Sequence, residues 1–142
     1  MPDTKVVKQV DPRERILDFP MAADAVISIG DIVVLNTATV ASGVAERASV
    51  ATTLTGLGIA VEAKDNTGGA AGDERIHVST APHALTLEAG SLDYSNLGDT
   101  VYAVDENTID GDDAGATRSA YGVLTHVDAD GQLFVRPTIA SL

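Results

Sequence analysis

Residues 28–36, SIGDIVVLN, have the pattern of a polar turn followed by a buried strand, and residues 96–105, NLGDTVYAVD, repeat this pattern. In each copy a Gly-Asp pair comes before a run of mostly apolar residues. Glycine and aspartate favour turns, whereas valine and isoleucine favour strands. We therefore predict structural turns at Gly30-Asp31 and at Gly98-Asp99, each leading into a strand.

A second pair of matching segments extends the repeat. Residues 57–63 match residues 121–127, and an acidic turn and a closing strand follow each of them, at 75–78 and at 133–136. The order of the segments is kept while the loops differ in length. Two related units of this kind would close the sheet into a small barrel or sandwich. The alternative is that Gly-Asp turns recur before valines by chance.

The rest of the chain also favours β structure. Short segments rich in Val, Ile, Thr and Leu alternate with Gly and Asp, and several have apolar residues at every second position. The best helical candidate, residues 44–51, is too short to be stable alone, and a single helical turn is possible at 91–96. We predict an all-β fold with strands near residues 25–29, 32–36, 55–64, 75–80, 83–88, 100–104, 121–127 and 132–137.

The 142 residues fit one domain, which we place at residues 21–142, with an extended N-terminal arm at 1–20. There is no cysteine, which excludes disulfides and thiolate metal sites. No apolar run reaches the roughly 18 residues of a membrane helix. The first residues have no apolar stretch of the signal-peptide type, so we expect synthesis and retention inside a cell.

The net charge is −12, from 21 acidic and 9 basic residues. An acidic surface repels nucleic acid and anionic membranes, so we expect neither as a partner. The first fifteen residues are an exception, because their basic residues slightly outnumber their acidic ones. A basic leader on an acidic body indicates an arm that binds another molecule.

The arm sequence also favours an extended conformation, through its valines and Pro12. Such a segment can add as a strand to a neighbour's sheet or lie in a groove between subunits. The candidate partner-binding residues are Lys5, Val6, Val7, Lys8, Val10, Pro12, Arg13 and Arg15.

No pattern in the sequence predicts a reaction centre or a cofactor. His77, His83 and His126 have neither cysteines nor the close spacing of zinc ligands, so we interpret them as surface or interface residues. The acidic stretches 105–113 and 128–131 lack a calcium-loop pattern and indicate solvated turns, with weak cation binding as the alternative. Nucleophile elbows and phosphate loops are also missing. We predict that the protein is not an enzyme and holds no metal or cofactor.

Four segments resemble the small capsid decoration proteins, also called cement proteins, of tailed phages and related viruses: 30–35, 58–60, 98–105 and 121–123. This chain departs from the usual pattern by longer turns at 68–72 and 110–115. The resemblance implies a non-enzymatic β-barrel made in the host cytoplasm that binds the major capsid protein on the virion exterior. It also implies self-association, with a trimer favoured and a dimer possible.

Two other functions stay open at this point. One is a carbohydrate- or receptor-binding module displayed on a particle or cell surface, and the other is a tail or tube subunit. Sugar binding usually uses exposed aromatic rings, and this chain has only five Phe and Tyr residues and no Trp. This scarcity favours the decoration protein over the carbohydrate-binding module.

Overall fold

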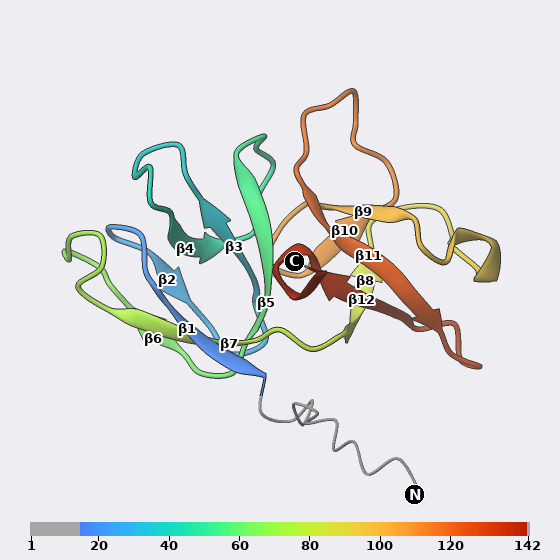
Figure 1. Cartoon of the computed structure of the whole chain (residues 1–142), viewed down its shortest axis with the longest axis horizontal. Helices are drawn as coiled ribbons and strands as arrows, with labels where there is room; N and C mark the ends of the chain where they lie inside the picture. The colour runs from blue at the N-terminus through green and yellow to red at the C-terminus, as the bar shows by residue number, and fades with distance from the viewer. Residues whose placement is uncertain (1–14, 142) are drawn as a thin grey trace, which may run out of the picture.

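The computed structural model describes residues 15–141, and the all-β prediction is confirmed. Figure 1 shows two β-rich units side by side, residues 16–79 in blue to green and residues 83–137 in yellow to red. The strands are β1 (Ile16–Pro20), β2 (Val26–Ile27), β3 (Ile32–Asn36), β4 (Val44–Arg47), β5 (Leu54–Ala60), β6 (Lys64–Asp65), β7 (Arg75–Ser79), β8 (His83–Leu87), β9 (Thr100–Ala103), β10 (Thr108–Asp110), β11 (Ala120–Val127) and β12 (Leu133–Pro137).

The first unit is a five-stranded sheet in the order β1-β7-β5-β3-β4, and β2 and β6 pair separately beside it. All neighbours in the five-stranded sheet are antiparallel. The two outermost strands approach each other at one parallel bridge, between Met21 and Ala45. There the Ala22 amide donates to the Ala45 carbonyl at 2.9 Å.

The second unit is a closed five-stranded barrel in the order β10-β8-β12-β11-β9. It closes where β8 and β10 run parallel, with Leu87 opposite Ile109. The Glu88 amide donates to the Ile109 carbonyl at 2.7 Å, as Ala22 does to Ala45 in the first unit. Strands β8, β12, β11, β9 and β10 therefore correspond to β1, β7, β5, β3 and β4.

The two Gly-Asp turns that the sequence predicts have the same geometry. Gly30 and Gly98 both have φ of +89°, a left-handed conformation that glycine adopts at little cost. The Gly30 amide donates to the Ala60 carbonyl at 2.9 Å, and the Gly98 amide donates to the Leu124 carbonyl at 2.9 Å. The repeat is thus a property of the fold, and chance recurrence of Gly-Asp pairs does not explain it.

The strand register confirms two of the three sequence matches and corrects the third. Val33 pairs with Gly58, and Val101 pairs with Gly122 in the second unit. Val78 pairs with Ala60 and Val135 with Leu124, so Val78 corresponds to Val135. The match of the two sequence segments had made Val78 correspond to residue 136, one position too far along the second unit. Closure also occurs within the second unit rather than by pairing of the two units.

Three local expectations differ from the structure. Residues 44–47, interpreted as part of a helical candidate, form β4 because they pair with β3 along their whole length. The last five residues of the predicted arm form β1, which pairs with β7. The short strand β10 was not predicted at all. The helical turn expected at 91–96 is present as a 3-10 turn, Tyr94–Asn96.

Two apolar cores hold the units together. One lies inside the first unit around Met21, Leu57 and Ile76. The other fills the second unit and also takes in Ile32 and Val34, which lie on the face of β3 turned away from the first core. The first unit therefore contributes to the core of the second.

A close backbone contact between β5 and β11 fixes this arrangement. A Cβ atom at Gly56 would overlap the Tyr121 carbonyl oxygen, so only glycine fits there. Nearby, the buried Ser119 hydroxyl accepts from the Leu54 amide at 3.1 Å and donates to the Ala51 carbonyl at 2.6 Å. Only residues 80–82 connect β7 to β8, so the two units are joined by a short connection as well as by their core.

Candidate interaction surfaces

Of the predicted partner-binding residues, only Arg15 is among the described residues. Arg15 is exposed, and its carbonyl accepts hydrogen bonds from the Thr80 amide at 2.9 Å and the Thr80 hydroxyl at 3.3 Å. The arm therefore joins the body beside the end of β7. The others lie outside the described residues: Lys5, Val6, Val7, Lys8, Val10, Pro12 and Arg13.

Strand β1, which follows Arg15 directly, has an open edge and exposed apolar side chains. Ile16 is 44% exposed and Leu17 is 49% exposed. One edge of β1 pairs with β7, and at the other edge the described residues pair only at the Met21–Ala45 bridge, beyond the end of the strand. Arg15 and Met21 hydrogen-bond toward β7, so by the alternation of a strand the backbone groups of Ile16 and Asp18 face the open edge, where Pro20 has no amide hydrogen to offer.

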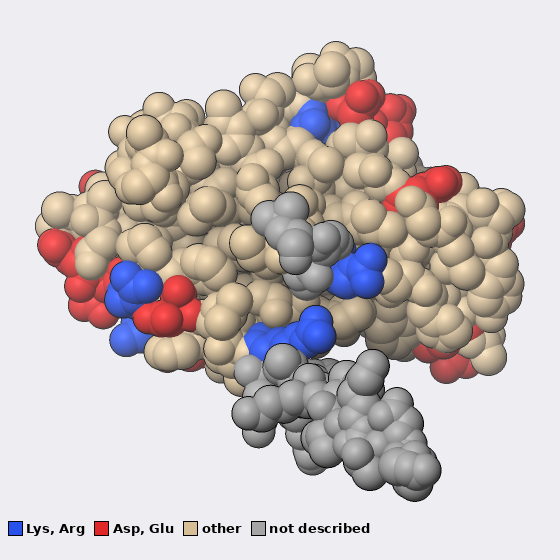
Figure 2. Space-filling view, in the orientation of Figure 1, with Lys and Arg blue, Asp and Glu red and all other residues tan. Residues whose placement is uncertain are grey.

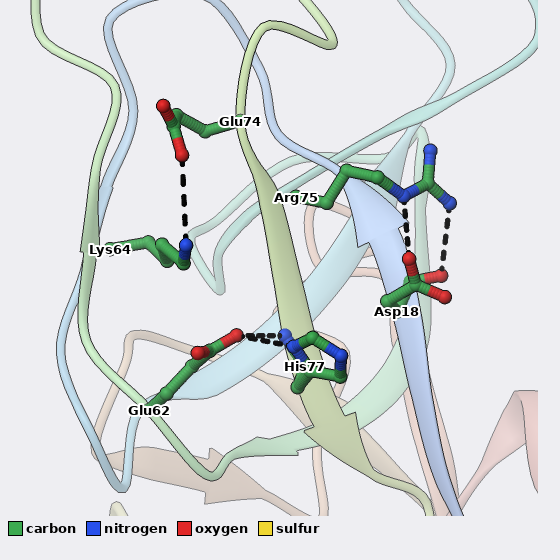
Figure 3. Close-up of polar contacts among 6 residues, drawn as sticks. All are labelled: Asp18, Glu62, Lys64, Glu74, Arg75 and His77. Carbon is green, nitrogen blue, oxygen red and sulfur yellow. Dashed lines mark hydrogen bonds and ion pairs between the residues drawn. The ribbon is translucent and has the colours of Figure 1, made fainter.

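Two ion pairs and one histidine–carboxylate contact lie near one another around β1, β6 and β7 (Figure 3). Arg75 Nε lies 2.6 Å from Asp18 Oδ2, His77 Nδ1 lies 2.6 Å from Glu62 Oε2, and Lys64 Nζ lies 3.7 Å from Glu74 Oε1. All six side chains are solvent-accessible, so each pair contributes little to stability. These charges keep that face hydrated, and Asp18 brings one of the pairs onto β1 itself, directly after Leu17.

The pKa values of two of these carboxyl groups are lowered by their partners. The hydrogen bond from Arg75 lowers the pKa of Asp18. Hydrogen bonds from the His77 ring and from the His77 amide lower the pKa of Glu62. Both carboxylates therefore stay ionised over a wider pH range than free side chains do.

The predicted turn residues serve mainly to build the fold. Asp31 is buried, and its Oδ2 atom accepts from the Ser28 amide at 2.8 Å and from Arg47 Nε at 2.7 Å. Asp99 is exposed, and its Oδ2 atom accepts from the Asn96 side chain at 3.2 Å. Arg47 is a partner that the sequence analysis missed, because nothing in the sequence links it to a turn sixteen residues away.

A charge-free surface lies at one edge of the first unit. It consists of the β3–β4 loop, residues 37–43, and the β4–β5 loop, residues 48–53, which together we call the crown. Figure 1 shows both loops along the upper edge, while the described chain begins at the lower edge. Figure 2 shows this upper-left region without charged side chains, whereas acidic atoms gather at the two ends and at the upper right.

Hydrogen bonds join the two loops of the crown. Asn36 Oδ1 accepts from the Thr53 hydroxyl at 3.1 Å and from the Ala38 amide at 2.8 Å. The Thr37 amide also donates to the Thr53 carbonyl at 3.4 Å. The crown is therefore one connected surface rather than two independent loops.

The corresponding loops of the second unit are acidic and tightly hydrogen-bonded. Arg118 Nη1 lies 2.7 Å from Asp110 Oδ2 and donates to the Asp112 carbonyl at 3.0 Å. Asp105 Oδ1 accepts from the Thr108 hydroxyl at 2.7 Å, and this hydrogen bond lowers the pKa of Asp105. A shallow groove lies between the 111–119 loop of the second unit and the β4–β5 loop of the first. It is lined by Thr52, Thr55, Arg118 and Thr138.

The histidines lie apart and have different partners. His77 and His126 are exposed, as predicted; His77 pairs with Glu62, and the His126 ring lies 5.9 Å from the Phe134 ring. His83 Nδ1 lies 2.7 Å from the Ala81 carbonyl. Within residues 15–141, no three His, Cys, Asp or Glu side chains are grouped as a metal site would need.

Comparisons of the chain with family models, with curated proteins and with solved structures found no match. Among the described residues, no helix has the length and apolar character needed to cross a membrane.

Proposed function

We propose that this chain is a virion structural protein that binds the outer surface of an assembled capsid and stabilises it, anchored by its N-terminal arm. The partner is the major capsid protein, and copies of the chain also associate with one another, with a trimer favoured and a dimer possible. The protein acts without catalysis. The framework of the fold, the edge of β1 and the distribution of charge support this role.

The resemblance to capsid decoration proteins rests on residues that form the framework of both units. The Gly30-Asp31 and Gly98-Asp99 turns lie at the start of β3 and β9, and Gly58 and Gly122 lie on the strands that pair with them. These positions recur because the fold needs them. They support a likeness of fold, and the partner has to be argued from the surface.

The observation that carries the proposal is the junction between the basic arm and the open edge of β1. The chain enters the first sheet at Arg15, and the next residues, Ile16 and Leu17, expose apolar side chains on a strand whose second edge is paired with no other described residue before Met21. An extended segment of a partner can pair with such an edge, and the arm can bind the same partner nearby. The body tethered by the arm is then held at high effective concentration.

The charge distribution suits the same role. The basic residues of the arm can pair with acidic groups of a shell, while the acidic body does not bind the nucleic acid inside it. Many copies, each weakly bound, together hold neighbouring shell subunits in place. The shared core and the Gly56–Tyr121 contact make the body a single block that can resist deformation.

The proposal is tested by co-sedimentation with empty shells assembled from the major capsid protein encoded in the same genome. The full chain is compared with a variant lacking residues 1–14, which keeps the Arg15–Thr80 hydrogen bonds. We expect the full chain to sediment with the shells and the truncated chain to stay in the supernatant while keeping its circular dichroism spectrum and melting temperature.

A second variant, Leu17→Asp, places a charge on the β1 edge, and Ile29→Asp adds the same charge at an exposed turn that the proposal does not use. We expect weaker shell binding for Leu17→Asp and unchanged binding for Ile29→Asp. Shell binding by the truncated chain that equals that of the full chain would refute the anchor, and failure of the full chain to bind would refute the function.

A further inference from the structure

The charges of the crown can be compared with those of the corresponding loops in the second unit. They have the same topology, so the loops of the crown correspond to residues 104–107 and 111–119 of the second unit. Those loops contain four acidic residues and one arginine, whereas the crown contains no charged residue. Since the same fold accepts charged loops at these positions, the fold does not explain the neutrality of the crown.

This neutrality extends beyond the loops. Glu46 and Arg47 are the only charged residues between Ile32 and Val61, in a chain whose net charge is −12. Both lie in β4 and are only partly exposed, and both are paired: Glu46 with Asn36 and Arg47 with Asp31. The exposed side chains of the crown are all small or β-branched: Thr37, Ala38, Thr39, Ala41, Ser42, Ser49, Val50, Thr52 and Thr53.

Burial of the crown in a contact would also cost little conformational entropy. Alanine, serine, threonine and valine lose little side-chain entropy when they are buried. The hydrogen bonds that Asn36 Oδ1 accepts from both loops already hold the surface in shape. Val50 is 55% exposed, so it offers apolar area that a contact would remove from water.

We infer that the crown is the surface through which copies of this chain associate, crown against crown. Two molecules of charge −12 repel each other across any pair of acidic surfaces. The repulsion falls off over about 8 Å at physiological salt, so it is smallest where the nearest charges lie farthest from the contact. A basic partner would bind the acidic loops instead, whereas a neutral surface complements another neutral surface. The crown of a second copy is such a surface.

This inference rests on the self-association that is part of the proposed function and names its surface. Because a crown-against-crown contact is self-complementary, it selects the dimer rather than the trimer. Its experiment contains no capsid shells, so failure of the crown contact and failure of capsid binding are distinguishable. Sedimentation of the full-length chain is measured from about 10 µM to about 1 mM, which spans moderate to weak affinities. We expect a mass above the 14.6 kDa of one chain at the upper concentrations.

Two crown variants and one matched control identify the surface. Val50→Asp and Thr39→Asp each add a negative charge to an exposed position of the crown. Ile29→Asp makes the same aliphatic-to-acid change at the opposite end of β3, where the side chain is 70% exposed. We expect each crown variant to raise the dissociation constant at least about tenfold, because like charges face each other in the contact. The control should change it less than about twofold, because its charge lies away from the contact.

The response to salt gives an independent readout. A contact between neutral crowns should persist, or tighten slightly, from about 0.05 to about 0.5 M NaCl, since salt screens only the repulsion. Association of a basic arm with the acidic body of another copy would instead weaken over that range and would be lost on removal of residues 1–14. A monomer at all concentrations, equal association of the crown variants and wild type, or loss of association on truncation would each overturn the inference. Unchanged circular dichroism spectra verify that every variant is folded.

Discussion

Replacing Gly56 with alanine measures how tightly the two units are packed. The new Cβ atom would lie 2.8 Å from both the carbonyl carbon and Cδ1 of Tyr121, and closer still to the carbonyl oxygen. The atoms in the way are mostly backbone of a central strand, so no rotamer change relieves the overlap. Strands β5 and β11 would have to move apart, and the contacts of the shared core beside them would lengthen.

The cost follows from this movement. A gap of 0.5–1 Å already removes about a quarter to a half of the attraction between facing atoms. Adding a methyl group to a well-packed core typically costs about 1–3 kcal/mol, and we expect the upper end here because the opposing atoms are rigid. For a chain of this size, a loss of about 3 kcal/mol lowers the melting temperature by roughly 10 °C.

The assay is urea unfolding at pH 7, followed by circular dichroism, together with a thermal melt. Gly111→Ala is the matched control, because the nearest atom to its new Cβ is Leu92 Cδ2 at 3.3 Å, the far end of a partly buried side chain rather than backbone. We expect the control to stay within about 0.5 kcal/mol of wild type. A Gly56→Ala protein as stable as this control would show that the two units do not pack as closely as the structure describes.

Three further predictions address other features. Glu62→Gln should destabilise the protein slightly at pH 7 and by less as the pH falls. The pKa of Glu62 is lowered, so its stabilising effect is present above the ordinary value of 4.5 and is lost as the pH falls through the lower value of the folded state. A difference in urea midpoint between variant and wild type that grows toward acid pH would contradict this. Ser119→Ala leaves the buried Leu54 amide without its partner and should cost about 1–3 kcal/mol of unfolding free energy in the same assay, so a change under about 0.5 kcal/mol would refute the role of this hydroxyl. Gly30→Ala and Gly98→Ala should each cost about 1–2 kcal/mol, because both residues have the same left-handed φ, and clearly unequal costs would argue against equivalent turns.

The features of the fold that could be predicted from the sequence are those that depend on local pattern. The Gly-Asp turns have a chemical reason at each position, and alternating apolar residues identify most of the longer strands. Residues 44–47 look helical in isolation, and only their pairing with β3 makes them a strand. Residues 16–20 contain a proline and follow a charged leader, so nothing local indicates a strand that pairs nearly sixty residues later.

The surfaces were harder to predict for a related reason. The absence of charge between Ile32 and Val61 can be read in the sequence, but whether these residues form one surface depends on which loops lie together. The hydrogen bonds of Asn36 supply that answer. Most of the predicted arm lies outside the described residues, so the prediction for its side chains stays a prediction.

The order of the strands in each unit has a consequence for how the chain is made. The first strand of each unit pairs with the last, so neither sheet is complete until its whole segment has been synthesised. Ile32 and Val34 then stay uncovered until the second unit folds against them. During translation this apolar face is available to another nascent chain, and the three residues that link β7 to β8 leave little slack for a late rearrangement. Slow synthesis of residues 83–137 should therefore favour exchanged dimers over correctly folded single molecules.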